Sequence, residues 1–169
     1  GVKYVIHKTS DGEMVWAFPF RKYPPEQFEK IYDDGGYNVF VNKNAYPKAF
    51  VVSNVIKSAS KNNEFKRIFE YDLRKTAIVS DQIAGLDNNA KGTAKITKYT
   101  SNKIELEVTT SGTSLLVLTD SFYPGWKAYV EGKPTKIYKT DYAFRGIVVP
   151  SGKSHVVFSY TPQSFLIGT

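Results

Sequence analysis

The stretch that decides the fold is Ile104-Glu105-Leu106-Glu107-Val108, in which apolar and charged residues alternate strictly. A period of two is typical of a strand that is buried on one face. A short apolar run follows, Ser114-Leu115-Leu116-Val117-Leu118-Thr119, and it indicates a central strand. The two segments together favour a β protein.

Further strand-like segments extend in both directions from this pair, and turns rich in Gly, Pro and Asp separate them. Towards the C-terminus they cover residues 126–131, 135–140, 144–149 and 153–160. Towards the N-terminus they cover residues 2–6, 15–20, 28–32, 37–41 and 49–56. Short strands at close, regular spacing indicate an antiparallel sandwich or barrel.

One helix is expected over residues 61–69, where Ser60 supplies an N-cap and Phe65, Ile68 and Phe69 fall on one face. No stretch resembles a linker. We therefore predict a mainly β protein, an antiparallel, jelly-roll-like β-sandwich with one short helix, which forms a single domain over residues 1–169.

The composition excludes several classes of site. The 169 residues include no cysteine, so thiol catalysis, a disulfide framework and Cys-ligated zinc are ruled out. Glu105 and Glu107 lie about 7 Å apart on one strand face, but water there keeps both ionised, whereas a general acid needs a raised pKa. His7 and His155 have no partner at a metal-ligand spacing. We expect no catalytic set, no metal and no cofactor.

Aromatic residues gather around one predicted turn. Tyr123-Pro124-Gly125-Trp126 suits a type II turn, because Pro presets φ at the second position and Gly supplies a positive φ at the third. Clustered aromatic rings with an arginine at loop tips can stack on sugars, which makes a carbohydrate site of Tyr123, Trp126, Tyr129, Tyr142 and Arg145. The alternative is structural, with Trp126 and Phe144 as core anchors and Tyr123 as a corner residue.

The net charge of +7 points to an anionic partner. The 23 basic residues are 19 Lys and only 4 Arg, whereas nucleic-acid readers favour Arg, so we expect no nucleic-acid partner. A Lys-rich surface fits diffuse attraction to a polyanion or a membrane surface, and a solvated face that maintains solubility is the alternative. The residues predicted for this role are Lys127, Lys133, Lys136 and Lys139.

Two segments of the chain are the most specific, Tyr-Pro-Gly-Trp-Lys at residues 123–127 and Ala-Phe-Arg-Gly at residues 143–146. Together with further segments, they resemble the C-terminal region of YfhO-like bacterial membrane proteins. Residues 44–52 and 71–77 are similar to two further family segments, with Tyr46, Lys48 and Leu73 as departures from the family pattern. The resemblance covers roughly residues 37–165.

This resemblance implies a polytopic membrane protein related to C-type glycosyltransferases, linked to glycosylation of envelope polymers such as lipoteichoic acid. In that architecture the catalytic acidic residues lie in a loop near the N-terminus of the full protein, so none is carried over to this chain and Asp120 is not assigned a catalytic role. The module would face outward from the membrane and position an acceptor polymer or partner near the parent transmembrane domain. An independent carbohydrate-binding module is the alternative.

The chain ends fit an excised piece of such a protein. The chain starts with Gly1, its only methionine is Met14, and residues 164–169 turn apolar, as the first turn of a membrane helix would. We expect the isolated piece to be a soluble monomer on the extracytoplasmic side of a bacterial cell membrane.

Overall fold

The computed structural model describes residues 2–8 and 23–161. These residues form fourteen strands in three sheets and one short helix, which confirms the mainly β prediction. The expected strand over residues 15–20 and the apolar residues 164–169 lie outside the described residues. By its internal contacts the chain divides into two units, Gly1–Pro47 and Lys48–Thr169, and the single-domain organisation stays a prediction.

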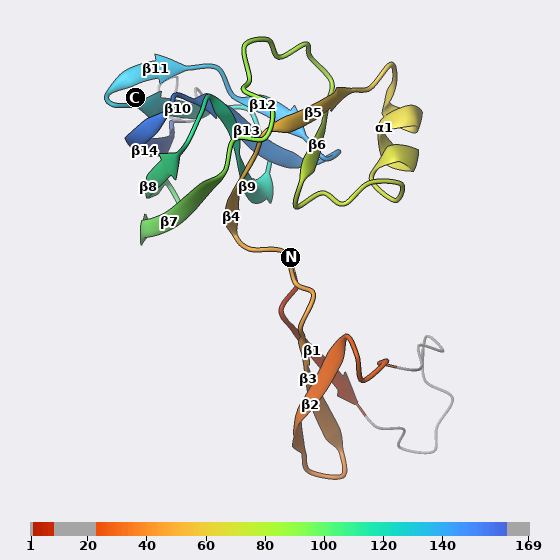
Figure 1. The fold of residues 1–169 in the computed structure, drawn as a ribbon. Coiled ribbons are helices and arrows are strands. Elements are labelled where there is room, and N and C mark those ends of the chain that lie inside the picture. Colours follow the sequence, from red (N-terminus) through yellow and green to blue (C-terminus); the bar gives the residue numbers. More distant parts are fainter. Residues whose placement is uncertain (1, 9–22, 162–169) are drawn as a thin grey trace. The chain divides into compact units, whose positions relative to one another are not determined.

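The first unit is a three-stranded antiparallel sheet in the order β1-β3-β2 (Figure 1). Its packing is largely aromatic: the Tyr23 ring stacks on Phe40 with centroids 4.3 Å apart and meets Phe28 edge-on. His7 also packs edge-on against Tyr23, at 5.7 Å. The strands are β1 (Tyr4–Lys8), β2 (Phe28–Asp33) and β3 (Tyr37–Asn42).

The second unit contains a five-stranded antiparallel sheet in the order β11-β10-β14-β8-β7. The expected strand over residues 135–140 is wrong in its bounds. Thr135 ends β11, whereas Tyr138–Thr140 form a separate strand, β12, in the six-stranded sheet of the same unit. The strands are β7 (Gly92–Tyr99), β8 (Lys103–Thr110), β10 (Trp126–Val130), β11 (Lys133–Thr135) and β14 (Gly152–Tyr160).

A six-stranded sheet in the order β4-β9-β13-β12-β6-β5 completes the second unit. The single strand expected over residues 49–56 is two strands at opposite edges of this sheet. β5 and β6 run parallel, an exception to the antiparallel prediction, while the other strand pairs are antiparallel. The strands are β4 (Ala49–Val52), β5 (Asn54–Lys57), β6 (Thr76–Val79), β9 (Ser114–Ser121), β12 (Tyr138–Thr140) and β13 (Phe144–Val149).

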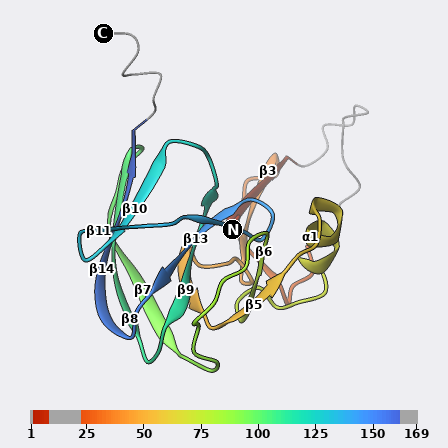
Figure 2. The same ribbon diagram turned by 90° about the horizontal axis from the view of Figure 1, so that it is seen from above.

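Both sheets of the second unit contribute to one core, so they form the predicted sandwich (Figure 2). The alternation in β8 is confirmed, because Ile104, Leu106 and Val108 are at most 1% exposed and Glu107 is exposed. The apolar run of β9 is buried completely from Leu115 to Leu118. It supplies Leu116 and Leu118 to this core, and Leu115 and Val117 to a second core on the other face of the sheet.

The helix α1 (Lys61–Arg67) starts where predicted and ends two residues early. The Ser60 side chain accepts a hydrogen bond from the Asn63 backbone N–H at 3.2 Å, as an N-cap does. The expected apolar face is not what the helix buries: Phe65 and Phe69 are 52% and 76% exposed, and Glu64 is 1% exposed. The reason is a hydrogen bond to Glu64 from the turn after β12, described below.

Gly146 in β13 is a position where only glycine fits. A Cβ atom added there would lie 2.6 Å from Thr140 Cγ2 and 3.3 Å from Leu115 Cδ1. We expect Gly146→Ala to lower the free energy of unfolding by about 1–3 kcal/mol, because overpacking forces neighbours apart. Urea denaturation measures this, with Gly36→Ala as the control because its nearest atom would be 3.5 Å away. Equal stability of the two variants would contradict the prediction.

Candidate functional site

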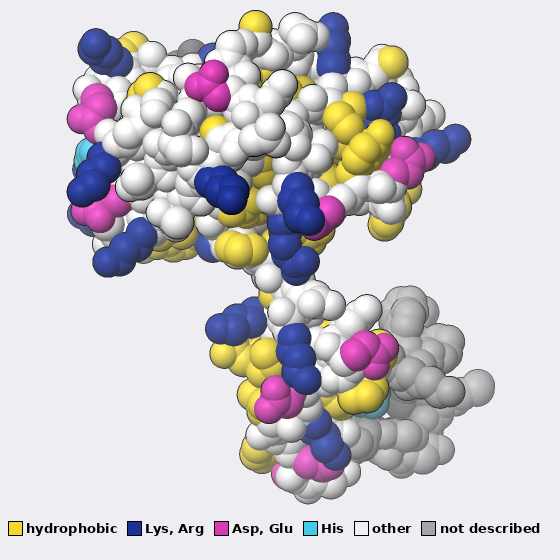
Figure 3. Space-filling model, in the orientation of Figure 1, with side chains coloured by type: hydrophobic (Ala, Val, Ile, Leu, Met, Phe, Trp, Pro, Cys, Tyr) yellow, Lys and Arg dark blue, Asp and Glu magenta, His cyan; other side chains and the backbone are white. Residues whose placement is uncertain are grey.

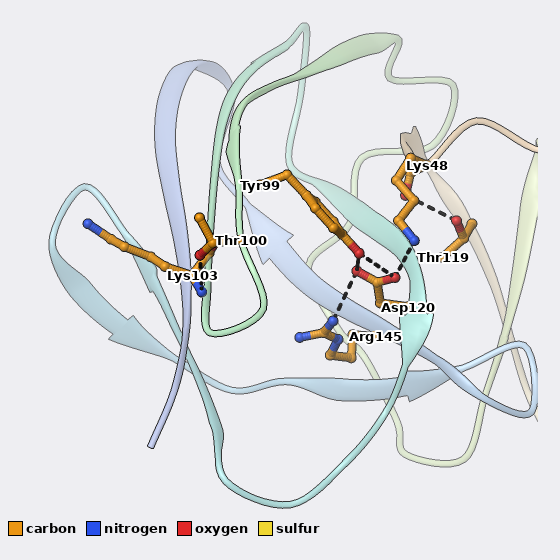
Figure 4. Close-up of polar contacts among 7 residues, drawn as sticks. All are labelled: Lys48, Tyr99, Thr100, Lys103, Thr119, Asp120 and Arg145. Carbon is orange, nitrogen blue, oxygen red and sulfur yellow. Dashed lines mark hydrogen bonds and ion pairs between the residues drawn. The ribbon is translucent and has the colours of Figure 1, made fainter. Parts of the chain in front are cut away.

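Asp120, near the end of β9, is the centre of a polar network that the sequence did not reveal (Figure 4). Its carboxylate accepts hydrogen bonds from the Tyr99 hydroxyl at 3.0 and 3.1 Å and forms an ion pair with Arg145 Nη2 at 3.2 Å. The Lys48 ammonium donates to the same carboxylate. Burial opposes the charge of Lys48, but its hydrogen bonds to Asp120 and Tyr99 raise its pKa overall. The carboxylate is therefore fully engaged with protein partners.

Strand pairing brings these residues together. Ala49 of β4 pairs with Leu118 of β9, which places Lys48 beside the end of β9. Arg145 pairs with the same Leu118 from the other side, next to a register shift between Phe144 and Arg145. The network therefore joins three strands of the six-stranded sheet, the edge strand β4 and the interior strands β9 and β13. Tyr99 connects them to β7 of the five-stranded sheet.

The Arg145 guanidinium lies between the acidic group and an aromatic ring. Its Cζ atom is 3.9 Å from the centroid of the Trp126 ring, a cation–π geometry. The residue is 2% exposed, and burial lowers its pKa. Among the described residues, its Nε and Nη1 atoms have no hydrogen-bond partner. Arg145 thus couples Asp120 to Trp126, and Trp126 and Arg145 belong to the two specific segments at residues 123–127 and 143–146.

Three of the five residues predicted for carbohydrate share one pocket of about 310 Å³ beside β10. Tyr123 is 61% exposed, whereas Trp126 and Tyr129 are partly buried. The expected turn is present, since Gly125 has a φ of +97°. The pocket is lined by Tyr123, Trp126, Lys127 and Tyr129, together with Phe122, Pro124, Ala128, Pro134, Thr135 and Ile137.

The other two predicted residues do not line this pocket. Arg145 is buried on Trp126, as described. Tyr142 is 43% exposed and its ring packs edge-on against Phe65 of α1, with centroids 5.8 Å apart. The structural alternative for Trp126 has support in its packing against the core and against Tyr160. The carbohydrate role of all five residues stays a prediction.

The four predicted cationic residues are spread along β10 to β12. Lys127 lines the pocket, and Lys133 is exposed at the start of β11. Lys136 pairs with Asp81 at 2.6 Å, which raises the pKa of Lys136. Lys139 lies 4.8 Å from the centroid of the Tyr142 ring. Their role towards polyanions stays a prediction.

Two carboxyl groups lie buried where α1 meets the turn after β12. Glu64 accepts a hydrogen bond from the Tyr142 backbone N–H at 2.9 Å, and Asp141 accepts one from the Ile78 N–H at 2.8 Å. Burial and the charge of Glu64 raise the pKa of Asp141 to about 7. Asp141 and Tyr142 both have positive φ, at +48° and +70°. The sequence showed a turn here and gave no sign of buried acids.

In the described ranges, no three His, Asp or Glu side chains are arranged to hold a metal ion. His155 contacts Glu105 at 3.5 Å. Over the same ranges, no helix has the length and apolar character to cross a membrane.

Comparisons with known proteins agree with the sequence resemblance. The family described as "Bacterial membrane protein YfhO" matches residues 64–169. A relative from Bacillus subtilis (strain 168), named "Uncharacterized protein YfhO", is 29% identical over 101 residues. That alignment covers 57% of this chain and 12% of the relative, so the chain spans a small part of the relative's length. No solved structure is significantly similar to the chain.

Proposed function

Because the chain belongs to the YfhO family of bacterial membrane proteins, we propose that it is a non-catalytic accessory domain of a membrane glycosyltransferase-like protein. It faces the extracytoplasmic side and holds an acceptor glycan near the parent transmembrane domain during glycosylation of an envelope polymer of the lipoteichoic acid type. The reaction itself takes place elsewhere in the parent protein. The domain contributes a binding surface and a cationic exterior.

The observation that carries this proposal is the aromatic pocket beside β10. Tyr123, Trp126 and Tyr129 line about 310 Å³, a volume at the lower end for small-ligand sites. Aromatic rings give sugars an apolar face to stack on, while Lys127 in the same lining attracts an anionic polymer. The most exposed ring, Tyr123, is accessible to a ligand without any rearrangement of the core.

A titration of the chain with purified envelope polysaccharides tests the pocket. We expect Tyr123→Ala and Tyr129→Ala each to weaken binding by about tenfold, because each removes roughly 1–2 kcal/mol of ring contact. Isothermal calorimetry measures the affinity, and circular dichroism checks that the variants fold.

Tyr71→Ala is the matched control, since Tyr71 is 41% exposed and does not line the pocket. Equal loss of affinity in the control, or unchanged affinity in both pocket variants, would refute the proposal that the glycan binds in this pocket. Loss of folding in Tyr129→Ala would show that this ring is structural. The affinity of Tyr123→Ala would then decide whether the pocket binds the glycan.

The exposure of Tyr123 in the pocket also favours a second candidate, an independent carbohydrate-binding module. Deletion of the module from the full-length protein separates the two. Reduced envelope glycosylation, with the membrane part still inserted, supports the accessory role. Undiminished glycosylation together with glycan binding by the isolated chain supports the independent module.

A further inference from the structure

Three aromatic rings form an exposed cluster at α1, here called the aromatic patch: Phe65, Phe69 and Tyr142. The Phe65 ring meets Phe69 edge-on at 5.3 Å and Tyr142 at 5.8 Å. Despite these mutual contacts, the three residues are 52%, 76% and 43% exposed. Grouped exposed apolar side chains of this size are uncommon on soluble surfaces and mark interaction sites.

The patch is held in place from beneath. The Tyr142 backbone N–H donates to buried Glu64, which anchors the turn after β12 to the helix. Glu64 is the residue that α1 buries, so the phenylalanine side chains next to it along the helix are left on the outside. The exposure of the rings therefore follows from how the helix is attached.

Basic residues border the patch. Lys139 lies 4.8 Å from the centroid of the Tyr142 ring. Lys61 precedes Phe65 by one helical turn and so shares its side of the helix. Figure 3 shows hydrophobic side chains gathered beside α1, with Lys and Arg side chains next to them. Glu70 and Asp72 are exposed acids that follow the helix, and the carboxyl groups of Glu64 and Asp141 are buried at the turn that carries Tyr142.

We propose that the aromatic patch and its basic border dock the second unit on an anionic lipid surface. Aromatic side chains favour the interface between headgroups and acyl chains, where they bury apolar area. Lysine stems bury along the same apolar region while their charges stay among anionic headgroups. The basic border favours an anionic lipid surface over an apolar groove on another protein. The family is one of membrane proteins, so a bilayer is close to this domain.

Vesicle co-sedimentation of the full 169-residue chain tests the proposal. The vesicles contain phosphatidylcholine alone or mixed with anionic phosphatidylglycerol. We expect binding to the mixed vesicles and weak binding to the neutral ones. The double variant Phe65→Ser/Phe69→Ser should lower the partition coefficient on mixed vesicles by about tenfold or more, since two rings lose their apolar contact with the interface.

The control is Ile6→Ser, because Ile6 is 72% exposed in β1 of the first unit and does not belong to the patch. A second measurement uses Phe69→Trp, whose added fluorescence over the wild type should be quenched by brominated lipids. Equal binding of the double variant and the wild type would overturn the proposal in favour of diffuse charge adsorption. So would an absence of vesicle binding, or light scattering that shows the patch mediating self-association instead. The glycan titration uses the pocket beside β10, so its result is independent of this one.

Discussion

Asp120→Ala is expected to lower the free energy of unfolding by about 3–5 kcal/mol, the range for removing one partner of a buried ion pair. Arg145 is 2% exposed, and among the described residues Asp120 is its ion-pair partner. The variant leaves that guanidinium charged against the Trp126 ring with no counter-ion. For a chain of this length the melting temperature should fall by about 10 °C, which differential scanning calorimetry measures.

Lys136→Ala is the matched control, because its pair with Asp81 is exposed on both sides and surface pairs contribute at most about 1 kcal/mol. The double variant Asp120→Ala/Arg145→Leu should be more stable than Asp120→Ala alone, since it also removes the unpaired charge. If Asp120→Ala and Lys136→Ala lowered the free energy of unfolding by similar amounts, the Asp120 network would stabilise the fold no more than a surface ion pair does.

Asp141→Asn is expected to stabilise the protein at pH 8 by about 3 kcal/mol, and to have little effect near pH 4. The folded-state pKa of Asp141 is about 7, above its ordinary value of 3.8. The stability that the neutral carboxyl contributes is therefore fully present below about pH 4, and it is lost as the pH rises to 7. Asparagine keeps the acceptor for the Ile78 N–H and tolerates the positive φ.

Urea denaturation of the wild type and the variant at several pH values between 4 and 8 measures this difference. Glu64→Gln is an informative companion, because the charge of Glu64 is one cause of the raised pKa of Asp141. In that variant the decline in stability should still begin near pH 4 and should end at a lower pH than in the wild type, because the folded-state pKa of Asp141 is lower. If the free energy of unfolding of the wild type and of Asp141→Asn changed with pH in the same way, the raised pKa of Asp141 would be contradicted.

The sequence predicted those strands and helix ends that a short local pattern marks clearly. The alternation in β8 and the apolar run of β9 gave both strands and their buried residues, and the Ser60 cap gave the start of α1. Strands β6 and β7 were missed. β7 has only half-buried apolar positions, Ala94 and Ile96, and its polar residues hide the alternation.

The Asp120 network could not be predicted, because it depends on which strands become neighbours. Lys48 and Asp120 are 72 residues apart, and nothing in a single sequence marks them as partners. One signal was available for Arg145: it is the only arginine in a C-terminal region otherwise supplied with lysines, and arginine is favoured for buried ion pairs. The exposure of Phe65 and Phe69 was equally hidden, since helical periodicity places them on an apolar face.

The position of β14 in the five-stranded sheet has a consequence for biosynthesis. This last strand lies in the interior of its sheet, with β10 on one side and β8 on the other. A nascent chain that has not yet released residues 152–160 therefore lacks the strand that joins the two halves of that layer. The second unit must fold after nearly all of it has been translated, and slowly, because its strand pairings span long loops. Truncation before residue 152 should leave a polypeptide that chaperones or proteases recognise as unfolded.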